Sequence, residues 1–287
     1  MTVISGVMIV DDAADDPLAE VGDALGEEGI EVLRLSDFVR REGFDFDPEA
    51  ADLRRVRKSE PARPELGRVL DRIVAVSSLS LSQFDGGERL LRPGQLSFAY
   101  EMLLEEKGCA PESGIAYSTV GKVLPLPTQW RLVSQNLPDV GVPAYKHGYG
   151  PEMVPAEDFK KPIFKSPFDL YSWRTNERPD EVVWDQFIVE APAGTPVLSY
   201  FLGLNAVVSS LRAEVELEPE TSARLSELTL AIARLLRAEV GEILWFVEGD
   251  RVVFAAFSHM LAAARRHGRF AEAAGGFLRG FFSSEAN

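Results

Sequence analysis

The segments Lys161-Pro-Ile-Phe-Lys165 and Gln186-Phe-Ile-Val-Glu190 open the part of the sequence that decides the fold. Each is a short apolar run with polar residues at its ends, and we predict one β-strand over residues 161–165 and another over residues 182–190. Apolar hairpins are predicted over residues 197–211 and 242–257, with a long helix over residues 219–240 between them. This order of strands, hairpin, helix and hairpin predicts an antiparallel sheet with helices packed on it.

The predicted helix over residues 219–240 has the clearest helical pattern in the chain. Its apolar residues recur at helical spacing and form one stripe of Leu225, Leu228, Ile232, Leu235 and Leu236. We expect Gly241 to end this helix and Glu248-Gly-Asp250 to form the turn of the second hairpin. A helical tail is predicted over residues 261–282, with a break at Gly275-Gly276.

The beginning of the chain has the pattern of a small parallel α/β layer. Residues 3–10 are almost all apolar, as in a strand buried on both faces, and residues 30–35 form a second strand. Between them, Asp15 or Asp16 is expected to cap a helix that has Pro17 in its first turn and ends at Gly29. Because a strand, a helix and a strand follow one another, we predict a parallel sheet.

The rest of the N-terminal part is less regular. A third buried strand is predicted over residues 73–76, a helix over 96–107 and a short strand over 115–117. Residues 43–64 are polar and charged, and we interpret them as a long excursion.

The central region is predicted to contain a helix over residues 127–136, an extended segment over 142–145 and a loop over 148–152. We therefore divide the chain into three parts. Residues 1–122 form an α/β domain, residues 123–195 a central linker and lid region, and residues 196–287 a sheet with helices.

Composition excludes some classes of protein. The chain has 287 residues, of which 46% are hydrophobic and 26% charged, as in an ordinary globular protein. Its net charge of −15 disfavours nucleic acids and anionic membranes as partners, because both attract clustered Lys and Arg. The single cysteine, Cys109, cannot form an internal disulfide. The N-terminus lacks the basic region of a signal peptide and no apolar run approaches the ~20 residues of a membrane span, so we expect a cytoplasmic location.

The order of these segments resembles the ATP-grasp superfamily of carboxylate–amine ligases, which includes glutathione synthetase and peptide ligases of ribosomal peptide modification. Gly141-Val-Pro143 resembles the start of that family's small lid domain, and Lys161–Lys165 resembles the strand whose lysine grips the ATP phosphates. Gln186–Glu190 resembles the segment that binds the adenine edge, and Ala193–Ser199 resembles the strand that follows it. The N-terminal α/β unit resembles the family's pre-ATP-grasp domain.

The resemblance implies an ATP-grasp-like fold of class α/β, with an α+β C-terminal part, and ATP and Mg²⁺ as cofactors. It places Lys165 on phosphate, Gln186 and Glu190 on adenine and ribose, and Glu242 on the metal. Each residue also has an ordinary structural interpretation. Lys165 could be a strand-end lysine with its ammonium in solvent. Gln186 and Glu190 could form the solvated face of an edge strand.

The last two strands depart from the family pattern. Ala256 stands where the family has a metal-binding glutamate, and Ser258 where it has an asparagine. On the preceding strand only Glu242 is acidic near the expected position, and Leu198-Ser199 replaces an expected arginine. Hard cations need oxygen ligands, and phosphoryl transfer depends on the metal to neutralise charge.

Two hypotheses of different classes follow. The first is a ligase that activates a carboxylate of a peptide or amino acid as an acyl phosphate, for attack by an amine or hydroxyl. The alternative is a catalytically degenerate homologue, a pseudoenzyme that binds a peptide, a nucleotide or a partner protein, or itself as a homo-oligomer. A purely structural subunit is a third possibility. The ligase requires that Glu214, Glu216, Glu248 or Asp250 join Glu242.

Other candidate sites are open to both interpretations. His147, in a loop flanked by glycines, could touch a ligand or lie on an ordinary surface, and His259 could join a metal site. The third histidine is His267, and the three do not have zinc-site spacing. The aspartates at 11, 12, 15 and 16 could bind a cation or an amine, or form a solvated helix cap. Trp130-Arg131 and Trp173-Arg174 could stack on a base or a peptide, or simply pack.

Overall fold

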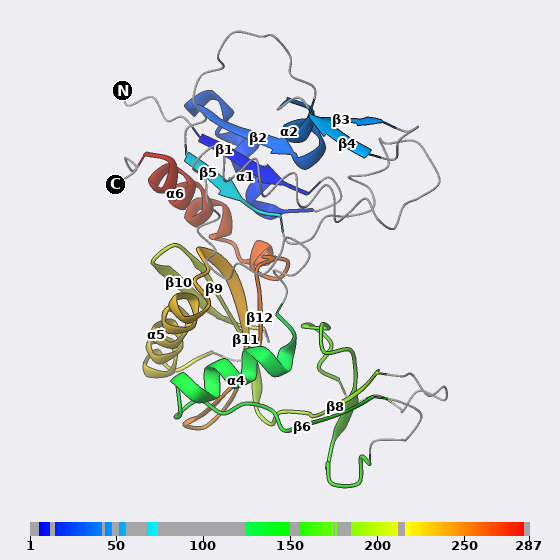
Figure 1. Cartoon of the computed structure of the whole chain (residues 1–287). Coiled ribbons are helices and arrows are strands. Elements are labelled where there is room, and N and C mark those ends of the chain that lie inside the picture. Colours follow the sequence, from blue (N-terminus) through cyan, green and yellow to red (C-terminus); the bar gives the residue numbers. More distant parts are fainter. Residues whose placement is uncertain are drawn as a thin grey trace. The chain divides into compact units, whose positions relative to one another are not determined.

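The computed structural model describes residues 6–11, 15–41, 44–47, 52–55, 68–73, 124–149, 155–174, 176, 185–211 and 216–283. The chain divides into two compact units (Figure 1). Unit 1 comprises residues 1–122, 236–239 and 260–287, and unit 2 comprises residues 123–235 and 240–259. The predicted three-part division at residues 122 and 195 stays a prediction.

Unit 1 is built on a three-stranded sheet in the order β2-β1-β5, in which neighbouring strands are parallel. Its strands are β1 (Gly6–Val10), β2 (Ile30–Arg34) and β5 (Arg68–Asp71). The predicted parallel α/β layer is therefore confirmed. The third strand was predicted too late, at residues 73–76. β5 forms one edge of the described sheet, where polar residues such as Arg68 and Asp71 are tolerated, so its sequence lacks a continuous apolar run.

The first helix, α1 (Pro17–Ala24), starts as the sequence predicts. Asp16 is its N-cap, and the carboxylate accepts a hydrogen bond from the backbone N–H of Leu18 at 2.9 Å. The helix ends before Gly29, however. A 3₁₀ turn (η1, Gly26–Glu28) follows α1, and it is this turn that Gly29 closes with a φ of 94°.

One helix and one hairpin of unit 1 were not predicted. Helix α2 (Leu35–Arg41) follows β2 directly and buries Leu35 and Phe38. Within the segment predicted as an excursion, β3 (Phe44–Asp47) and β4 (Asp52–Arg55) pair as an antiparallel hairpin. The other predicted elements of this part, at residues 96–107 and 115–117, lie outside the described residues, as does Cys109.

The C-terminal helix α6 (Phe270–Ser283) completes unit 1 by packing on α1. A short turn, η2 (Ala264–Arg266), precedes it. The predicted break at Gly275-Gly276 is wrong, because α6 continues through both glycines. Its apolar face buries Phe270, Ala274, Leu278, Phe281 and Phe282, and this burial outweighs the ~1 kcal/mol that each glycine costs a helix. The ring of Phe282 lies so close to Gly6 that a Cβ there would overlap it, at 1.9 Å.

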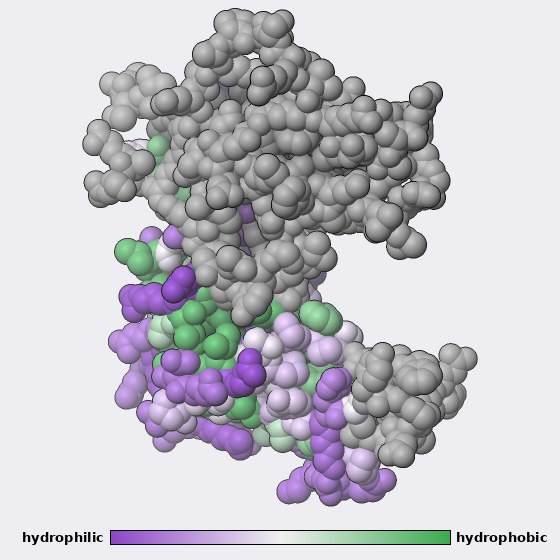
Figure 2. Space-filling model, in the orientation of Figure 1, coloured by the Kyte–Doolittle hydropathy of each residue, from purple (hydrophilic) through white to green (hydrophobic). Residues whose placement is uncertain are grey.

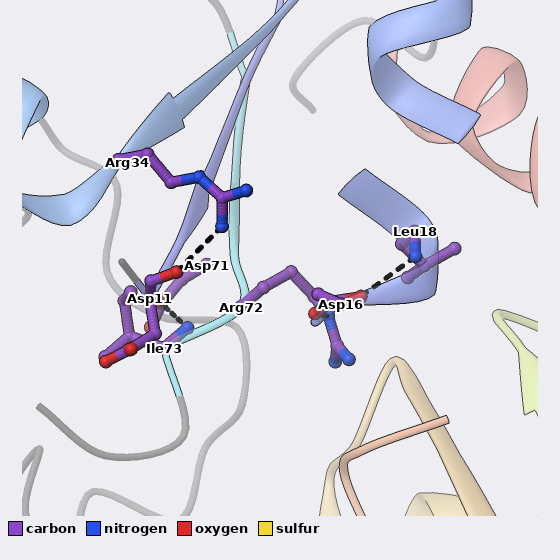
Figure 3. A network of polar contacts seen from close by, with 7 residues as sticks. All are labelled: Asp11, Asp16, Leu18, Arg34, Asp71, Arg72 and Ile73. Carbon is purple, nitrogen blue, oxygen red and sulfur yellow. Dashed lines mark hydrogen bonds and ion pairs between the residues drawn. The ribbon is translucent and has the colours of Figure 1, made fainter. Parts of the chain in front are cut away.

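The carboxyl-terminal edge of the parallel sheet carries a polar network (Figure 3). Asp16 forms an ion pair with Arg72 at 2.9 Å, and both side chains are buried. Arg34 donates a hydrogen bond to the backbone oxygen of Asp11 at 3.0 Å. The interpretation of a solvated aspartate cluster is therefore wrong for Asp11 and Asp16, which are buried and bonded within the protein, whereas Asp15 is exposed and pairs with Arg265.

Unit 2 contains a four-stranded antiparallel sheet, the large sheet, in the order β10-β9-β11-β12. Its elements are β9 (Thr195–Leu202), β10 (Asn205–Ser210), α5 (Pro219–Leu236), β11 (Val240–Glu248) and β12 (Arg251–Ser258). The two predicted hairpins and the helix between them are confirmed. In Figure 2, hydrophilic residues surround α5 on the visible face and apolar residues gather between α5 and α4.

Helix α5 ends earlier than predicted, at Leu236 rather than Val240. Arg237 adopts a left-handed backbone conformation with a φ of 49°, and the chain then turns into β11. Gly241 therefore does not close the helix. It lies inside β11 opposite Phe201, and a Cβ there would meet the ring of Phe257 at 2.4 Å.

Unit 2 also holds a small antiparallel sheet in the order β6-β8-β7. Its strands are β6 (Tyr145–Tyr149), β7 (Pro162–Phe164) and β8 (Asp185–Glu190). Gly148 and Tyr149 thus belong to a strand and not to the predicted loop. The predicted central helix is confirmed as α4 (Leu126–Asn136).

Helix α4 is fixed to the edge of the large sheet by its side chains. The side-chain amide of Gln129 is bonded to the backbone of Phe257 in β12, and the indole N–H of Trp130 donates to the oxygen of Ala255 at 2.8 Å. Gly141 forms a parallel bridge to Val253 on the same strand. No helix in the described residues has the length and apolarity that a membrane crossing requires.

Candidate functional site

Lys165 follows directly after β7, at the border of the small sheet. Its ammonium lies 4.0 Å above the ring of Trp173 and donates a hydrogen bond to the backbone oxygen of Ser172 at 2.7 Å. Burial lowers the pKa of Lys165 to about 8, and the nearby carboxylate of Asp169 partly opposes this shift. The side chain is therefore turned back onto its own chain. The ordinary interpretation, a strand-end lysine with its ammonium in solvent, is wrong.

The chain from Lys165 to Arg174 folds back on itself, and we call residues 166–174 the return segment. Asp169 organises it, because one carboxylate oxygen accepts the backbone N–H groups of Tyr171 and Ser172 at 3.1 and 3.0 Å. Burial disfavours the charged form of Asp169, but the hydrogen bonds from Ser172, the charge of Lys165 and the N–H of Tyr171 outweigh it and lower its pKa. The turn brings Tyr171 and Trp173 over the large sheet.

Tyr171 reaches two polar residues of the large sheet. Its hydroxyl lies 3.0 Å from a carboxylate oxygen of Glu242 and 2.7 Å from the hydroxyl of Ser258. Glu242 and Ser258 are paired across β11 and β12 and are both buried, Glu242 being only 2% exposed. Burial and the charge of Glu242 raise the pKa of Tyr171, so it stays a neutral hydrogen-bond donor.

Trp173 anchors the end of the return segment in an apolar cluster. It packs against a group formed by Phe246, Val253 and Ala255 of the large sheet, together with Leu244. Its indole N–H donates to the oxygen of Leu170 at 2.8 Å. The ring of Trp130 lies 6.3 Å from that of Trp173, and Trp130 is 1% exposed. Both tryptophans therefore pack within the protein.

The carboxylate of Glu190 binds backbone rather than solvent. Its two oxygens accept the N–H groups of Lys160 at 2.9 Å and Lys161 at 3.1 Å, which ties β8 to the chain before β7. Gln186 lies in β8 opposite Gly148, and its side chain is outside the described residues. The structure thus brings Lys165, Glu190 and Gln186 to the small sheet, but it places Glu242 on the large one.

The histidines do not gather at this site. His147 lies in β6 opposite Phe187, with the two rings 6.3 Å apart. His259 packs its ring edge-to-face on Phe257 at 4.7 Å. His267 follows the η2 turn in unit 1.

The other acidic residues considered for a metal site do not join Glu242. Glu248 and Asp250 are exposed at the turn of the β11–β12 hairpin, at the far end of the strands from the Glu242–Ser258 pair. Glu216 is exposed before α5, and Glu214 lies outside the described residues. In the part of the chain that the structure describes, no group of three His, Cys, Asp or Glu side chains could hold a metal ion.

The described residues therefore offer magnesium only a sparse set of ligands, with no acidic cluster around Glu242. Mg²⁺ demands near-octahedral oxygen coordination and is usually held by one or two carboxylates together with substrate phosphates. Glu242 is a single carboxylate, and Ala256 lies opposite Leu244 without an oxygen to offer. Chemically, the Glu242–Ser258 pair is arranged to hold a hydroxyl group.

Sequence reasoning missed the return segment, although it quoted Trp173. The available signal was local. An aspartate followed two residues later by an aromatic residue, in Asp169-Leu-Tyr-Ser-Trp173, is compatible with a side-chain-to-backbone turn. The reach of Tyr171 to Glu242, 71 residues further along the chain, depends on how the two sheets pack and has no signature in the sequence.

Comparison with known proteins gives matches by structure only. No protein-family model matches the sequence, and no curated protein matches it. Macrocyclase MdnC from Microcystis aeruginosa MRC, solved with the precursor peptide MdnA, is 14% identical, with 97% of this chain and 100% of that chain covered and a TM-score of 0.62. The ATP-grasp ligase PsnB, solved with a minimal precursor, is 15% identical, with 97% and 99% covered and a TM-score of 0.60. D-alanine–D-alanine ligase from Bacillus anthracis is 10% identical, with 97% of both chains covered and a TM-score of 0.55.

Proposed function

We propose that this chain, which has the fold of the ATP-grasp ligases, is a peptide-binding protein that does not carry out magnesium-dependent ligation. The observation that carries the proposal is the hydrogen bonding of Glu242, the one acidic residue on the described part of β11 and β12 near the expected metal position. Its carboxylate is buried and bonded to the hydroxyl of Tyr171, beside Ser258.

The physical argument rests on charge. Transfer of a phosphoryl group develops negative charge that metal ions and cationic side chains must neutralise. The ammonium of Lys165 lies over the ring of Trp173, but it is already bonded to the oxygen of Ser172. A single carboxylate that is already bonded to a hydroxyl offers magnesium few protein ligands, so this arrangement favours binding over catalysis.

A peptide is the ligand class that the comparisons support. MdnC and PsnB, whose fold this chain shares over 97% of its length, are both described in complex with precursor peptides. The net charge of −15 disfavours nucleic acids, as the sequence already indicated. A protein partner, a homo-oligomer and a cytoplasmic location stay predictions.

The second candidate is an active ligase, and one specific observation favours it. Lys165 stands at the end of β7, where the resemblance expects the lysine that binds phosphate. In this alternative, Lys165, Gln186 and Glu190 hold ATP, and a carboxylate of a peptide or amino acid is activated. It requires Tyr171 to leave Glu242 and further oxygen ligands to be supplied from outside the described residues.

Titration calorimetry with a non-hydrolysable ATP analogue, with and without magnesium, separates these two functions. We expect magnesium to leave the affinity for the analogue unchanged. In a separate assay with ATP and magnesium, we expect no ADP to form. Binding that magnesium strengthens tenfold or more, and that Glu242→Gln abolishes, would establish the ligase instead.

A displayed library of short random peptides tests the peptide-binding half of the proposal. We expect selection on the immobilised chain to enrich peptides that share a motif and bind with micromolar affinity. Enrichment no greater than on a matched surface without protein would overturn this half.

A further inference from the structure

We propose that the return segment is an intramolecular occupant of the site, and that a ligand reaches Lys165, Glu242 and Ser258 only after the segment is displaced. The inference rests on the proposed function in one respect, because it assumes that the ligand uses these side chains. The return segment would then be autoinhibitory, and the side chains that it covers indicate the chemistry of the ligand that displaces it.

The return segment forms hydrogen bonds with the side chains of Lys165, Glu242 and Ser258 at the same time. The oxygen of Ser172 accepts the ammonium of Lys165 at 2.7 Å. The hydroxyl of Tyr171 fills the space between the Glu242 carboxylate and the Ser258 hydroxyl, at 3.0 and 2.7 Å. An acceptor oxygen and a hydroxyl are groups that a peptide ligand also carries. The segment therefore occupies the site with the chemistry of a ligand.

The contacts of the segment suit displacement more than permanent packing. Tyr171 is 50% exposed although its hydroxyl is bonded, and Phe168 is 57% exposed. Little apolar surface is thus buried by these two rings, so polar contacts hold the part of the segment around Tyr171, whereas Leu170 and Trp173 remain its apolar anchors. Hydrogen bonds of this kind can be exchanged for those of a ligand with little net change in free energy.

The chemistry of the released side chains defines the ligand. The ammonium of Lys165 requires acceptor oxygens, such as those of a carboxylate or a backbone carbonyl. The carboxylate of Glu242 accepts hydrogen bonds and requires a donor, such as a hydroxyl or an amine. A peptide that carries a carboxylate or free carbonyl close to a hydroxyl or amine side chain meets both requirements.

Chemical labelling of lysine measures displacement without any ligand. We would treat the full chain with a water-soluble N-hydroxysuccinimide ester of acetic acid and quantify acetylation of each lysine by peptide mass spectrometry. We would measure the rates from about pH 7 to about pH 10 and compare the limiting rate of the unprotonated amine, because displacement also changes the pKa of Lys165. In Tyr171→Phe, we expect this limiting rate for Lys165 to be about 10-fold higher or more than in the wild type, because a hydrogen bond to a charged group is lost. Lys160 and Lys161, which are exposed just before β7, serve as internal references.

Tyr145→Phe is the matched control variant. Tyr145 lies in β6 of the small sheet and is 43% exposed. Its substitution therefore tests the loss of a tyrosine hydroxyl from a partly exposed residue outside the return segment. We expect it to leave the labelling of Lys165 unchanged. An equal rate for Lys165 in the wild type and in Tyr171→Phe would overturn the inference, and so would an equal rise at all lysines, which indicates general unfolding.

The same variants distinguish this inference from the proposed function. If Tyr171→Phe labels faster at Lys165 and also forms ADP from ATP and magnesium, displacement stands and the non-ligase function fails. If labelling of Lys165 does not change and no ADP forms, displacement fails and the proposed function is untouched.

Discussion

The side chain of Gln129 pairs with both backbone groups of Phe257 as a neighbouring strand would. Its amide nitrogen donates to the oxygen of Phe257 at 3.1 Å, and its amide oxygen accepts the N–H of Phe257 at 2.7 Å. Gln129 is 1% exposed, and it also donates to the oxygen of Leu124 at 2.8 Å. A helix thus satisfies a strand edge that would otherwise have buried, unpaired backbone groups.

Gln129→Leu is expected to lower the free energy of unfolding by ~2–4 kcal/mol, because it leaves two backbone groups of Phe257 buried without these partners. Urea unfolding of the variant and the wild type measures this loss. Gln135→Leu, an exposed position in the same helix, should change stability by less than ~0.5 kcal/mol. Equal effects of the two substitutions would contradict the role of Gln129.

The buried ion pair between Asp16 and Arg72 supports a second prediction. Asp16→Ala removes the N-cap of α1 and leaves the charge of Arg72, whose side chain is 4% exposed, without its carboxylate partner. We expect a loss of ~3–5 kcal/mol. Asp15→Ala breaks an exposed pair with Arg265 and should lower stability far less, because solvent screens that pair. Thermal unfolding of the two variants checks the contrast between these neighbouring residues.

A buried hydroxyl links α5 to the large sheet. Ser199 accepts the indole N–H of Trp245 at 2.7 Å and lies 2.6 Å from the hydroxyl of Thr229, which also donates to the oxygen of Leu225. Ser199→Ala should cost ~1–3 kcal/mol, because the indole N–H loses its acceptor. In a double-mutant cycle, Ser199→Ala should cost less in the Trp245→Phe background than in the wild type. Trp245→Phe removes the indole N–H that Ser199→Ala would otherwise leave without its acceptor. Strict additivity would refute the assigned role of Ser199.

Two glycines with positive φ angles separate backbone strain from steric overlap. Gly249 has a φ of 57° with open space at its Cβ position, so Gly249→Ala should cost ~1–2 kcal/mol. Gly194 has a φ of 104°, and a Cβ there would lie 2.4 Å from the oxygen of Val247. We expect Gly194→Ala to cost ~1–3 kcal/mol more than Gly249→Ala. Urea unfolding of both variants gives the difference directly.

The pKa of Lys165 predicts how stability depends on pH. The pKa of Lys165 is about 8 in the folded protein, and we take the ordinary lysine value of 10.5 for the unfolded chain. Between these two pH values, the unfolded chain binds a proton that the folded chain has released. Stability therefore rises with pH in this window, and the unfavourable contribution of Lys165 is fully present below pH 8. Lys165→Met removes that contribution.

We therefore expect Lys165→Met to be more stabilising, relative to the wild type, at about pH 7 than at about pH 10. Urea unfolding at the two pH values measures the difference. Lys161→Met, at an exposed lysine just before β7, is the control and should show no such pH dependence. A pH-independent difference between Lys165→Met and the wild type would contradict the lowered pKa.

Local patterns allowed much of the fold to be predicted. The N-cap at Asp16, the start of α5 and both apolar hairpins follow from capping, helical spacing and turn residues, which act over a few positions. The exceptions have tertiary causes. The burial of α6 overrides its two glycines, and β5 tolerates Arg68 and Asp71 because it is an edge strand.

The candidate site could be predicted only in part. The sequence identified Lys165, Glu190 and Glu242 by their order in the chain, but their partners depend on how sheets and loops pack. Glu190 binds the backbone of Lys160 and Lys161, and Glu242 binds Tyr171. Neither contact follows from spacing, because the partners are 29 or more residues apart.

The path of the chain through the two units determines the order in which they are completed during translation. Unit 1 begins with β1 and α1 but needs α6, whose Phe282 ring covers Gly6, and α6 lies beyond the last residue of unit 2. A ribosome that has synthesised residue 259 has therefore made every residue of unit 2, whereas unit 1 still lacks α6 and the burial that α6 provides. Completion of unit 1 thus waits for the last described helix, although this unit holds the first described strand.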